Sequence, residues 1–341
     1  IPPEVVDHIV KLILDNQCSD FSAVASFSLA CHSFRQIAFR RFFSVLFVTT
    51  KLQWSQLCQI PGMYGWVRTL DATTTALSAH PQILRHFTRL TSVKIDFSTE
   101  GLHTHEGYTK LLLSNLPASI TSLEFSFLPS ITPHLLSDIT VYCPNLESLA
   151  LRCTDRLRAD CCWTCYEDSA SCTVHSPLPD VICDFGDLTR AYGEVLSALG
   201  PSLRRLHLGV YLSSVDIFYD HVDHASTVAS FPSSPPEPFA FLDRRPFPPS
   251  ECSECQAAGY LVEEVRATEM VASAQMKVWL PRLESMCWST WFSKTGDGEC
   301  PCALENDHGD TGQEETASLW LRWGGKETTG ESDVQVKRTH W

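Results

Sequence analysis

The stretch Pro144-Asn145-Leu146-Glu147-Ser148-Leu149-Ala150-Leu151 decides the predicted fold. Its leucines have the spacing Leu-x-x-Leu-x-Leu, which does not fit one stripe of a helix. A short strand fits, because Leu149 and Leu151 then share one face at period two while their neighbours take the other face. The preceding run Leu135–Tyr142 has apolar residues at the spacing of one helix face, and Pro144 ends that helix. The unit is therefore a helix, a proline stop and a buried strand.

The same unit recurs along the chain. Early copies of the leucine spacing start 23, 30 and 26 residues apart, close to the period of about 20–29 residues in leucine-rich repeats. The predicted fold class is α/β, an irregular solenoid that resembles leucine-rich repeats and in which parallel strands alternate with helices. Besides 146–151, the matching segments are Val67–Ala72, Leu90–Ile95, Ile120–Phe125, Leu203–Leu208 and Leu283–Trp288, with Leu319–Trp323 as a candidate last strand.

Composition limits the class of protein. The chain has 341 residues, of which 44% are apolar, enough to bury a sizeable core. Its formal net charge is −14, whereas nucleic-acid binders usually present a basic surface, so we expect no nucleic-acid partner. We find no apolar run of transmembrane length and no signal peptide, and we therefore expect an intracellular protein, cytoplasmic, nuclear or both, without a membrane partner. The 15 cysteines then fit buried thiols or metal ligands better than disulfides.

Residues 1–46 depart from the repeat and are predicted to form a helical module ahead of a solenoid over residues 47–341. The prolines in Ile1-Pro2-Pro3-Glu4 favour a helix start. Two more short helices are predicted before residue 46. Such short helices cannot bury all of their apolar side chains among themselves, so the surplus needs a partner or the first repeat. The first helix carries an apolar face formed by Val5, Ile9, Leu12 and Ile13.

These N-terminal residues resemble a known motif, the F-box. Its usual pattern is Leu-Pro-x-Glu-Φ-Φ-x-x-Ile followed by Leu-x-x-Val-Cys-x-x-Trp. Apolar residues replace apolar ones at three positions, where Ile1 stands for leucine, Ala30 for valine and Phe34 for tryptophan. An F-box ahead of leucine-rich-like repeats is the arrangement of a large subfamily. The segments that carry the resemblance are Ile1-Pro2-Pro3-Glu4-Val5-Val6-x-x-Ile9, Ser28-Leu29-Ala30-Cys31-His32-Ser33-Phe34-Arg35 and Phe42-Phe43.

The resemblance implies a substrate receptor of a Skp–cullin–F-box ubiquitin ligase. The box would dock on a Skp-family adaptor, and through it on the cullin ligase, while the repeats hold an unknown target protein. The alternative is a non-ligase interaction or scaffold protein whose N-terminal helices only cap the solenoid, because a solenoid end would otherwise expose its core. The implied adaptor-binding residues are Ile1, Pro2, Pro3, Val5, Val6, Ile9, Leu29, Cys31 and Phe34.

The outward strand positions predict the target-binding surface. If the strands stack in parallel, these positions form one continuous concave face. Their side chains are small and polar with mixed charge, which suits a protein surface better than a small-molecule pocket. The candidate target-binding residues are Lys94, Asp96, Glu124, Arg152, Arg205, His207 and Tyr211.

Three insertions interrupt the predicted repeats, at about residues 153–187, 213–259 and 293–317. The first two each contain a cysteine pair with two intervening residues, a spacing that lets both thiolates reach one tetrahedral zinc. The pairs lie far apart in the sequence compared with ordinary zinc ribbons, so we expect free thiols and no cofactor. A zinc site is the alternative that the spacing leaves open, with Cys162, Cys165, Cys252 and Cys255 as its ligands.

We expect no enzyme. The sequence has no glycine-rich phosphate loop, no Gly-x-Ser-x-Gly elbow and no His-Glu-x-x-His helix. A metal-dependent or redox enzyme built on the cysteine insertions is the remaining competitor from another class. Without such a site, catalysis would belong to partner enzymes.

Overall fold

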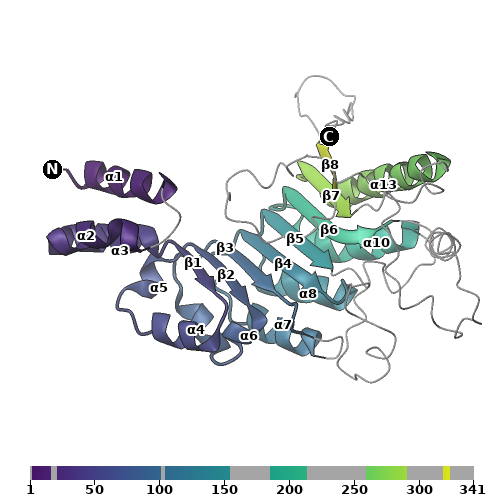
Figure 1. Ribbon diagram of the computed structural model, residues 1–341. Coiled ribbons are helices and arrows are strands. Elements are labelled where there is room, and N and C mark those ends of the chain that lie inside the picture. The colour runs from purple at the N-terminus through teal and green to yellow at the C-terminus, as the bar shows by residue number, and fades with distance from the viewer. Residues whose placement is uncertain are drawn as a thin grey trace, which may run out of the picture.

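The computed structural model describes residues 2–16, 21–100, 104–153, 185–212, 259–289 and 318–322 (Figure 1). Three helices at the N-terminal end precede a long sheet, and further helices lie along one side of that sheet. The architecture is α/β, with seven successive parallel strands that give it a solenoid-like form. The fold class predicted from the leucine spacing is thus confirmed at this level.

Within the described residues, eight strands form one sheet, and each strand lies beside the next one in the sequence. The first seven are parallel to one another, and the eighth is antiparallel to the seventh. Parallel neighbours need a crossover connection, which is why each predicted strand follows a helical run. The strands are β1 (Val45–Val48), β2 (Thr69–Thr73), β3 (Ser92–Asp96), β4 (Ser122–Leu128), β5 (Ser148–Cys153), β6 (Arg205–Tyr211), β7 (Ser285–Ser289) and β8 (Ser318–Arg322).

Helices and single turns supply the crossovers. Local capping fixes several of their starts: the hydroxyl of Thr132 accepts a hydrogen bond from the Leu135 amide at 3.2 Å, with Pro133 in the first turn. The elements are α4 (Lys51–Leu57), α5 (Met63–Trp66), α6 (Thr74–Leu77), η1 (Pro81–His86), α7 (His105–Leu113), α8 (Pro133–Tyr142), α10 (Phe185–Leu196), η2 (Ser197–Leu199) and α13 (Gly259–Trp279).

The core lies between the sheet and these helices, and the leucine motif builds it. Each copy contributes three inward residues, and none of them is more than 2% exposed in β2 to β7. Because side chains alternate across a strand, a register slip of one residue would turn a whole row toward solvent. The two rows on the strands are Leu46, Leu70, Val93, Leu123, Leu149, Leu206 and Met286, and Val48, Ala72, Ile95, Phe125, Leu151, Leu208 and Trp288.

The N-terminal helices α1 (Pro3–Asn16), α2 (Ser22–Ala30) and α3 (His32–Phe42) have a small core of their own. Val10, Val24 and Ala38 are fully buried in it. The module meets the first repeat through aromatic contacts. Phe43 stacks on Trp66 with the ring centroids 6.3 Å apart, and the Phe39 ring lies edge-on to the same indole at 6.0 Å.

Strand β1 was not predicted from the sequence. It begins at Val45, so the expected boundary at residue 46 falls inside a strand that is paired with β2 over its whole length. Four residues with no preceding copy of the leucine motif carry too little periodicity to indicate a strand. The sheet therefore starts directly where the helical module ends.

The C-terminal end of the sheet differs from the expected pattern in direction and in helix length. The candidate last strand is present as β8, but it runs antiparallel to β7. The helix before β7 extends over 21 residues, well beyond the short apolar run that signals it. Residues 154–184, 213–258 and 290–317, which include most of the three predicted insertions, lie outside the described residues.

Candidate interaction surfaces

Helix α1 carries apolar side chains on two faces. Val6 and Val10 are 2% and 0% exposed and lie against the rest of the helical module. Val5, Ile9 and Leu12 are 48%, 41% and 46% exposed. Their spacing of i, i+4 and i+7 places them on one stripe of the helix. Three residues of the apolar face expected from the sequence, Val5, Ile9 and Leu12, therefore point away from the module's core. The fourth, Ile13, is partly buried against that core.

Other residues of the expected adaptor-binding set also lie at the surface. Leu29, in the last turn of α2, is 73% exposed, a large fraction for a leucine. Phe34 is half-buried, and its ring stacks on Phe27 with the centroids 4.7 Å apart and the planes 7° apart. We use the name apolar helical surface for the apolar residues that the module leaves at its surface, on the stripe of α1 and at the junction of α2 and α3. Its exposed members are Pro2, Pro3, Val5, Ile9, Leu12, Leu29 and Cys31.

One residue of the expected set does not belong to this surface, and another cannot be placed on it or off it. The expectation that Val6 binds the adaptor is corrected, because its side chain is buried, only 2% exposed, and supports the fold instead. Ile1 lies outside the described residues. Leu12 is on the helix face expected from the sequence but not in the expected adaptor-binding set; at 46% exposed, it lies on the same stripe as Val5.

Ion pairs between Asp7 and two arginines hold α1 against α3. Arg41 Nε donates to Asp7 Oδ1 at 2.8 Å, and Arg40 donates to the same oxygen at 3.0 Å. The hydrogen bond from Arg41, more than any other contact, lowers the pKa of Asp7 to about 2, although partial burial opposes the shift. These contacts fix the rotation of α1 about its axis, and thereby decide which stripe of the helix faces solvent.

The sheet face opposite the helices carries a row of alternating charges across four strands. Lys94 Nζ lies 4.0 Å from Asp71 Oδ2 and 3.8 Å from Glu124 Oε1. Arg152 Nε lies 3.5 Å from Glu124 Oε1. Asp71, Lys94 and Glu124 are in direct register on β2, β3 and β4. We call this row the charged strand face; its side chains are between 26% and 45% exposed, so a partner can reach them.

Burial and neighbouring charges affect the acidic residues of this face. Burial raises the pKa of Asp71, and the positive charge of Lys94 opposes that rise. Asp96 lies one pleat further along β3 and accepts a hydrogen bond from the Ser98 amide at 2.7 Å. Arg205 is exposed at the start of β6, in register with Ser148. Both therefore stand where the sequence places them, on the side of the sheet away from the core.

His207 corrects the predicted extent of the target-binding face. It occupies an outward position in register with Ala150, yet it is only 7% exposed. Burial, with a smaller effect from the charge of Arg152, lowers its pKa to about 3, so the ring is neutral at physiological pH. Cys287, beside it on β7, is fully buried too. On β6 the accessible part of this face is therefore Arg205 without His207, and the side chain of Tyr211 lies outside the described residues.

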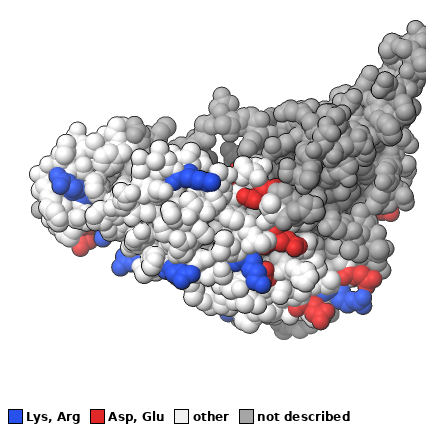
Figure 2. Space-filling model, turned by 90° about the horizontal axis from the view of Figure 1, so that it is seen from below, with Lys and Arg blue, Asp and Glu red and all other residues white. Residues whose placement is uncertain are grey.

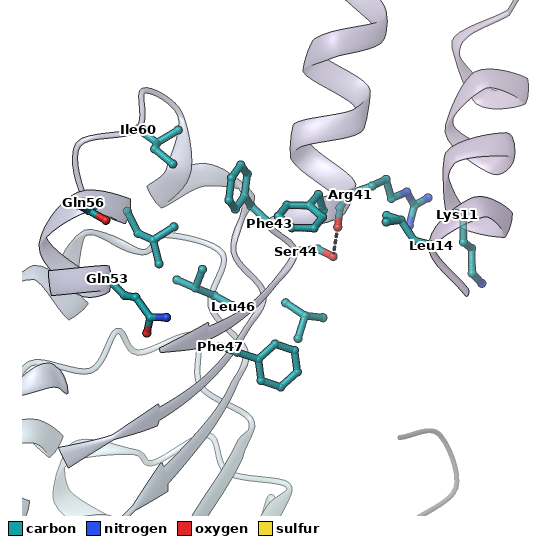
Figure 3. A pocket seen from close by; sticks show the side chains of 13 residues that line it. Lys11, Leu14, Arg41, Phe43, Ser44, Leu46, Phe47, Gln53, Gln56 and Ile60 are labelled. Carbon is teal, nitrogen blue, oxygen red and sulfur yellow. Dashed lines mark hydrogen bonds between the residues drawn. The ribbon is translucent and has the colours of Figure 1, made fainter. Parts of the chain in front are cut away.

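A groove of about 940 Å³ lies where the helical module meets the sheet (Figure 3). Lys11 and Leu14 of α1 stand on one side of it, and Gln53 and Gln56 of α4 stand on the other. Strand β1 runs between these walls. The remaining lining residues are Arg41, Phe42, Phe43, Ser44, Val45, Leu46, Phe47, Leu57 and Ile60.

The helix-covered side shows no row of charges like that of the charged strand face among the described residues. Figure 2 shows this side from below, with basic and acidic side chains scattered and of both signs among the described residues. No helix among the described residues is both long and apolar enough to cross a membrane.

The zinc candidates Cys162, Cys165, Cys252 and Cys255 lie outside the described residues. Across the ranges that the structure does describe, no three histidine, cysteine or acidic side chains come together as a possible metal site. Among the described cysteines, Cys31, Cys58 and Cys143 are free thiols. Burial raises the pKa of Cys143 to about 12 and that of Cys58 to about 11. Such thiols are protonated and chemically inert at neutral pH.

In comparisons with known proteins, no family model matches the chain and no curated protein matches it. What can be inferred about function comes from the chemistry of the apolar helical surface, the charged strand face and the groove beside β1.

Proposed function

We propose that the protein is a substrate-recognition adaptor of a Skp–cullin–F-box ubiquitin ligase. In this role the helical module docks on a Skp-family adaptor through the apolar helical surface, and the charged strand face holds a target protein. The protein itself carries out no chemical step, because ubiquitin transfer belongs to the partner enzymes. The role implies an intracellular location, in the cytoplasm, the nucleus or both.

One observation carries the proposal. A module of three short helices leaves a stripe of aliphatic side chains in water while a separate set fills its core. Exposed apolar stripes of this kind mark protein interfaces, since each aliphatic side chain that a partner buries contributes roughly 1.5–3 kcal/mol. The stripe contains Val5 and Ile9, two positions of the segment that resembles an F-box. Spacing and exposure thus favour the same surface.

The capping alternative makes a different demand on the same helices. A pure cap would direct its apolar residues at the first repeat, as Phe39 and Phe43 do with Trp66. Val5, Ile9 and Leu12 instead remain 41–48% exposed. They are therefore in excess of what a cap requires, and this excess favours a partner.

The adaptor interaction is tested with a double variant, Val5→Glu with Ile9→Glu. We expect binding to a purified Skp-family adaptor, measured by calorimetry, to weaken at least about tenfold, as interface hot spots do. Unfolding should stay within about 0.5 kcal/mol of wild type because both side chains are exposed. The matched control is Val141→Glu on α8, where a valine is 66% exposed far from the module.

The proposal fails if the wild-type chain does not bind the adaptor, or if the double variant binds it as tightly as Val141→Glu does. Unchanged stability together with no adaptor binding by the wild type would instead favour the scaffold alternative.

The target side of the proposal is tested through Lys94. Lys94→Glu replaces the central cation of the charged strand face with a carboxylate. This carboxylate would lie beside Asp71 and Glu124, so the variant loses two ion pairs. A target protein should be degraded more slowly in cells that carry this variant, and also in cells that carry the Val5→Glu, Ile9→Glu variant. A protein that responds to only one of the two is not a ubiquitination target held by this face.

A further inference from the structure

The outer edge of β1 borders the groove, and no described strand pairs with its backbone groups. The Ser44 carbonyl accepts hydrogen bonds from the amides of Arg68 and Thr69 at 2.8 and 3.0 Å, on the β2 side. Backbone polar groups alternate between the two edges of a strand, so Val45 and Phe47 direct their N–H and C=O groups to the other edge. Among the described residues, no strand pairs with that edge.

This edge lacks the usual protection against further pairing. Exposed edges are commonly blunted by lysine, proline or a bulge, and Val45-Leu46-Phe47-Val48 contains none of these. Val45 and Phe47 are 43% and 52% exposed. An apolar strand edge left open in this way is a template for one more strand.

The groove walls fit an added strand and set its side-chain pattern. Figure 3 shows Leu46 pointing to the side of Gln53 and Ile60, and Phe47 pointing away from that side. In a strand laid along β1, successive side chains would likewise alternate between the two walls. Those on the first wall would meet Leu57 and Ile60, which are half-buried aliphatic residues. Those on the second wall would meet α1.

The charges that line the groove determine which side chains of an added strand are favoured on the wall formed by α1. The groove lining contains two cations, Lys11 and Arg41, and no carboxylate, in a chain whose net charge is −14. Arg41 is paired with Asp7. Within the described residues, Lys11 has no ion pair and is exposed. An acidic side chain on this wall would therefore gain a partner without displacing an existing contact.

We propose that the groove beside β1 binds an extended segment of a partner protein in which apolar and acidic side chains alternate, and that this segment adds to the sheet as a strand. The site is separate from the apolar helical surface and does not depend on the ligase role. A second copy of the chain is a poorer occupant, because pairing two β1 edges would bring two sets of Lys11 and Arg41 into one groove.

The experiment uses the full chain and a fluorescein-labelled peptide of alternating valine and aspartate. Binding is measured by fluorescence anisotropy, and amide hydrogen exchange is followed for β1. We expect the amides of Val45 and Phe47 to become protected on binding, whereas Leu46 is already paired with β2. A peptide with lysine in place of aspartate should bind more weakly, and one with N-methylated amides on one edge should not bind.

Two pairs of variants separate the contributions. Phe47→Pro removes the outward N–H and should abolish binding, whereas Phe47→Ala keeps that N–H and should retain part of it; edge strands tolerate proline. Lys11→Glu should weaken binding about fivefold at low salt, and the control Lys110→Glu, an exposed lysine on α7, should not.

Several outcomes would overturn the proposal. One is the absence of protection at Val45 and Phe47 with about 1 mM peptide, a concentration that detects even weak binding. Equal binding of the N-methylated peptide would exclude strand addition. Protection that appears without peptide and grows with protein concentration would assign the edge to a second copy. If Phe47→Pro does not fold, the exchange measurement on the wild-type chain still decides.

Discussion

Gly193 of α10 lies directly against the indole ring of Trp279 of α13. A Cβ atom at Gly193 would overlap the ring, coming within 2.7 Å of Cγ and 2.8 Å of Nε1. The glycine therefore permits a close approach of two helices that are far apart in the sequence. This contact joins α10 to α13.

The first prediction concerns this contact. Gly193→Ala should lower the free energy of unfolding by about 1–3 kcal/mol, because the added methyl group overpacks the helix interface. Gly107→Ala on α7 is the matched control, since nothing lies within 4 Å of the position a Cβ would take there; it should be neutral or stabilise by about 0.4–1 kcal/mol. Denaturant unfolding measures both. If the two variants are equally stable, the helices do not approach each other as described.

The second prediction tests the inside and outside of β5. Leu149 is 1% exposed, so Leu149→Asp buries an unpaired carboxylate and should abolish cooperative thermal unfolding. Arg152→Gln removes only the exposed ion pair with Glu124 and should change the unfolding free energy by less than about 1 kcal/mol. Similar melting curves for both variants would mean that the register of the repeat is wrong.

The third prediction concerns a buried carboxyl group on α13. Glu269 is 1% exposed, and within the described residues neither of its carboxylate oxygens has a hydrogen-bond partner. Burial raises its pKa from 4.5 to about 8, and the charge of Arg266 opposes this rise. Between these two values the unfolded chain releases the proton while the folded chain keeps it, so stability should fall as the pH rises from 4.5 to 8.

Glu269→Gln removes this dependence. At pH 8 the variant should be more stable than wild type by roughly a few kcal/mol, and near pH 4 the two should melt alike. Glu264→Gln, an exposed position on the same helix, is the control and should track the wild type. A wild-type stability that does not fall over this pH range would contradict the buried position of the Glu269 carboxyl.

The fourth prediction concerns Asp7, whose pKa is lowered from 3.8 to about 2 by Arg41 and Arg40. A carboxylate with a lowered folded-state pKa stabilises above its unfolded pKa, so its contribution should be present above pH 3.8 and lost as the pH falls toward 2. Asp7→Asn should remove it at neutral pH and destabilise the helical module by roughly 1 kcal/mol, since the arginines are partly exposed. Amide exchange in α1 and α3 measures this, and β4 serves as the internal reference.

The repeating part of this protein follows from local sequence spacing. The spacing of Leu146, Leu149 and Leu151, and of its copies, placed six parallel strands in their positions, because alternation at period two is a local property of a strand. The same alternation put Lys94 and Glu124 on the side away from the core. Local capping and proline signals likewise indicated the ends of several helices.

Which side of the other elements is buried depends on the packing of the folded chain. It turned Val6 inward and Ile9 outward on α1, although both are aliphatic, because Asp7 and the arginines of α3 fix the rotation of that helix. It buried His207 on a face that the sequence predicts to be open, and it made a strand of Val45–Val48 by pairing it with β2. Each of these outcomes depends on contacts with residues that are distant in the chain. The local spacing around Val6, His207 and Val45–Val48 does not encode those contacts.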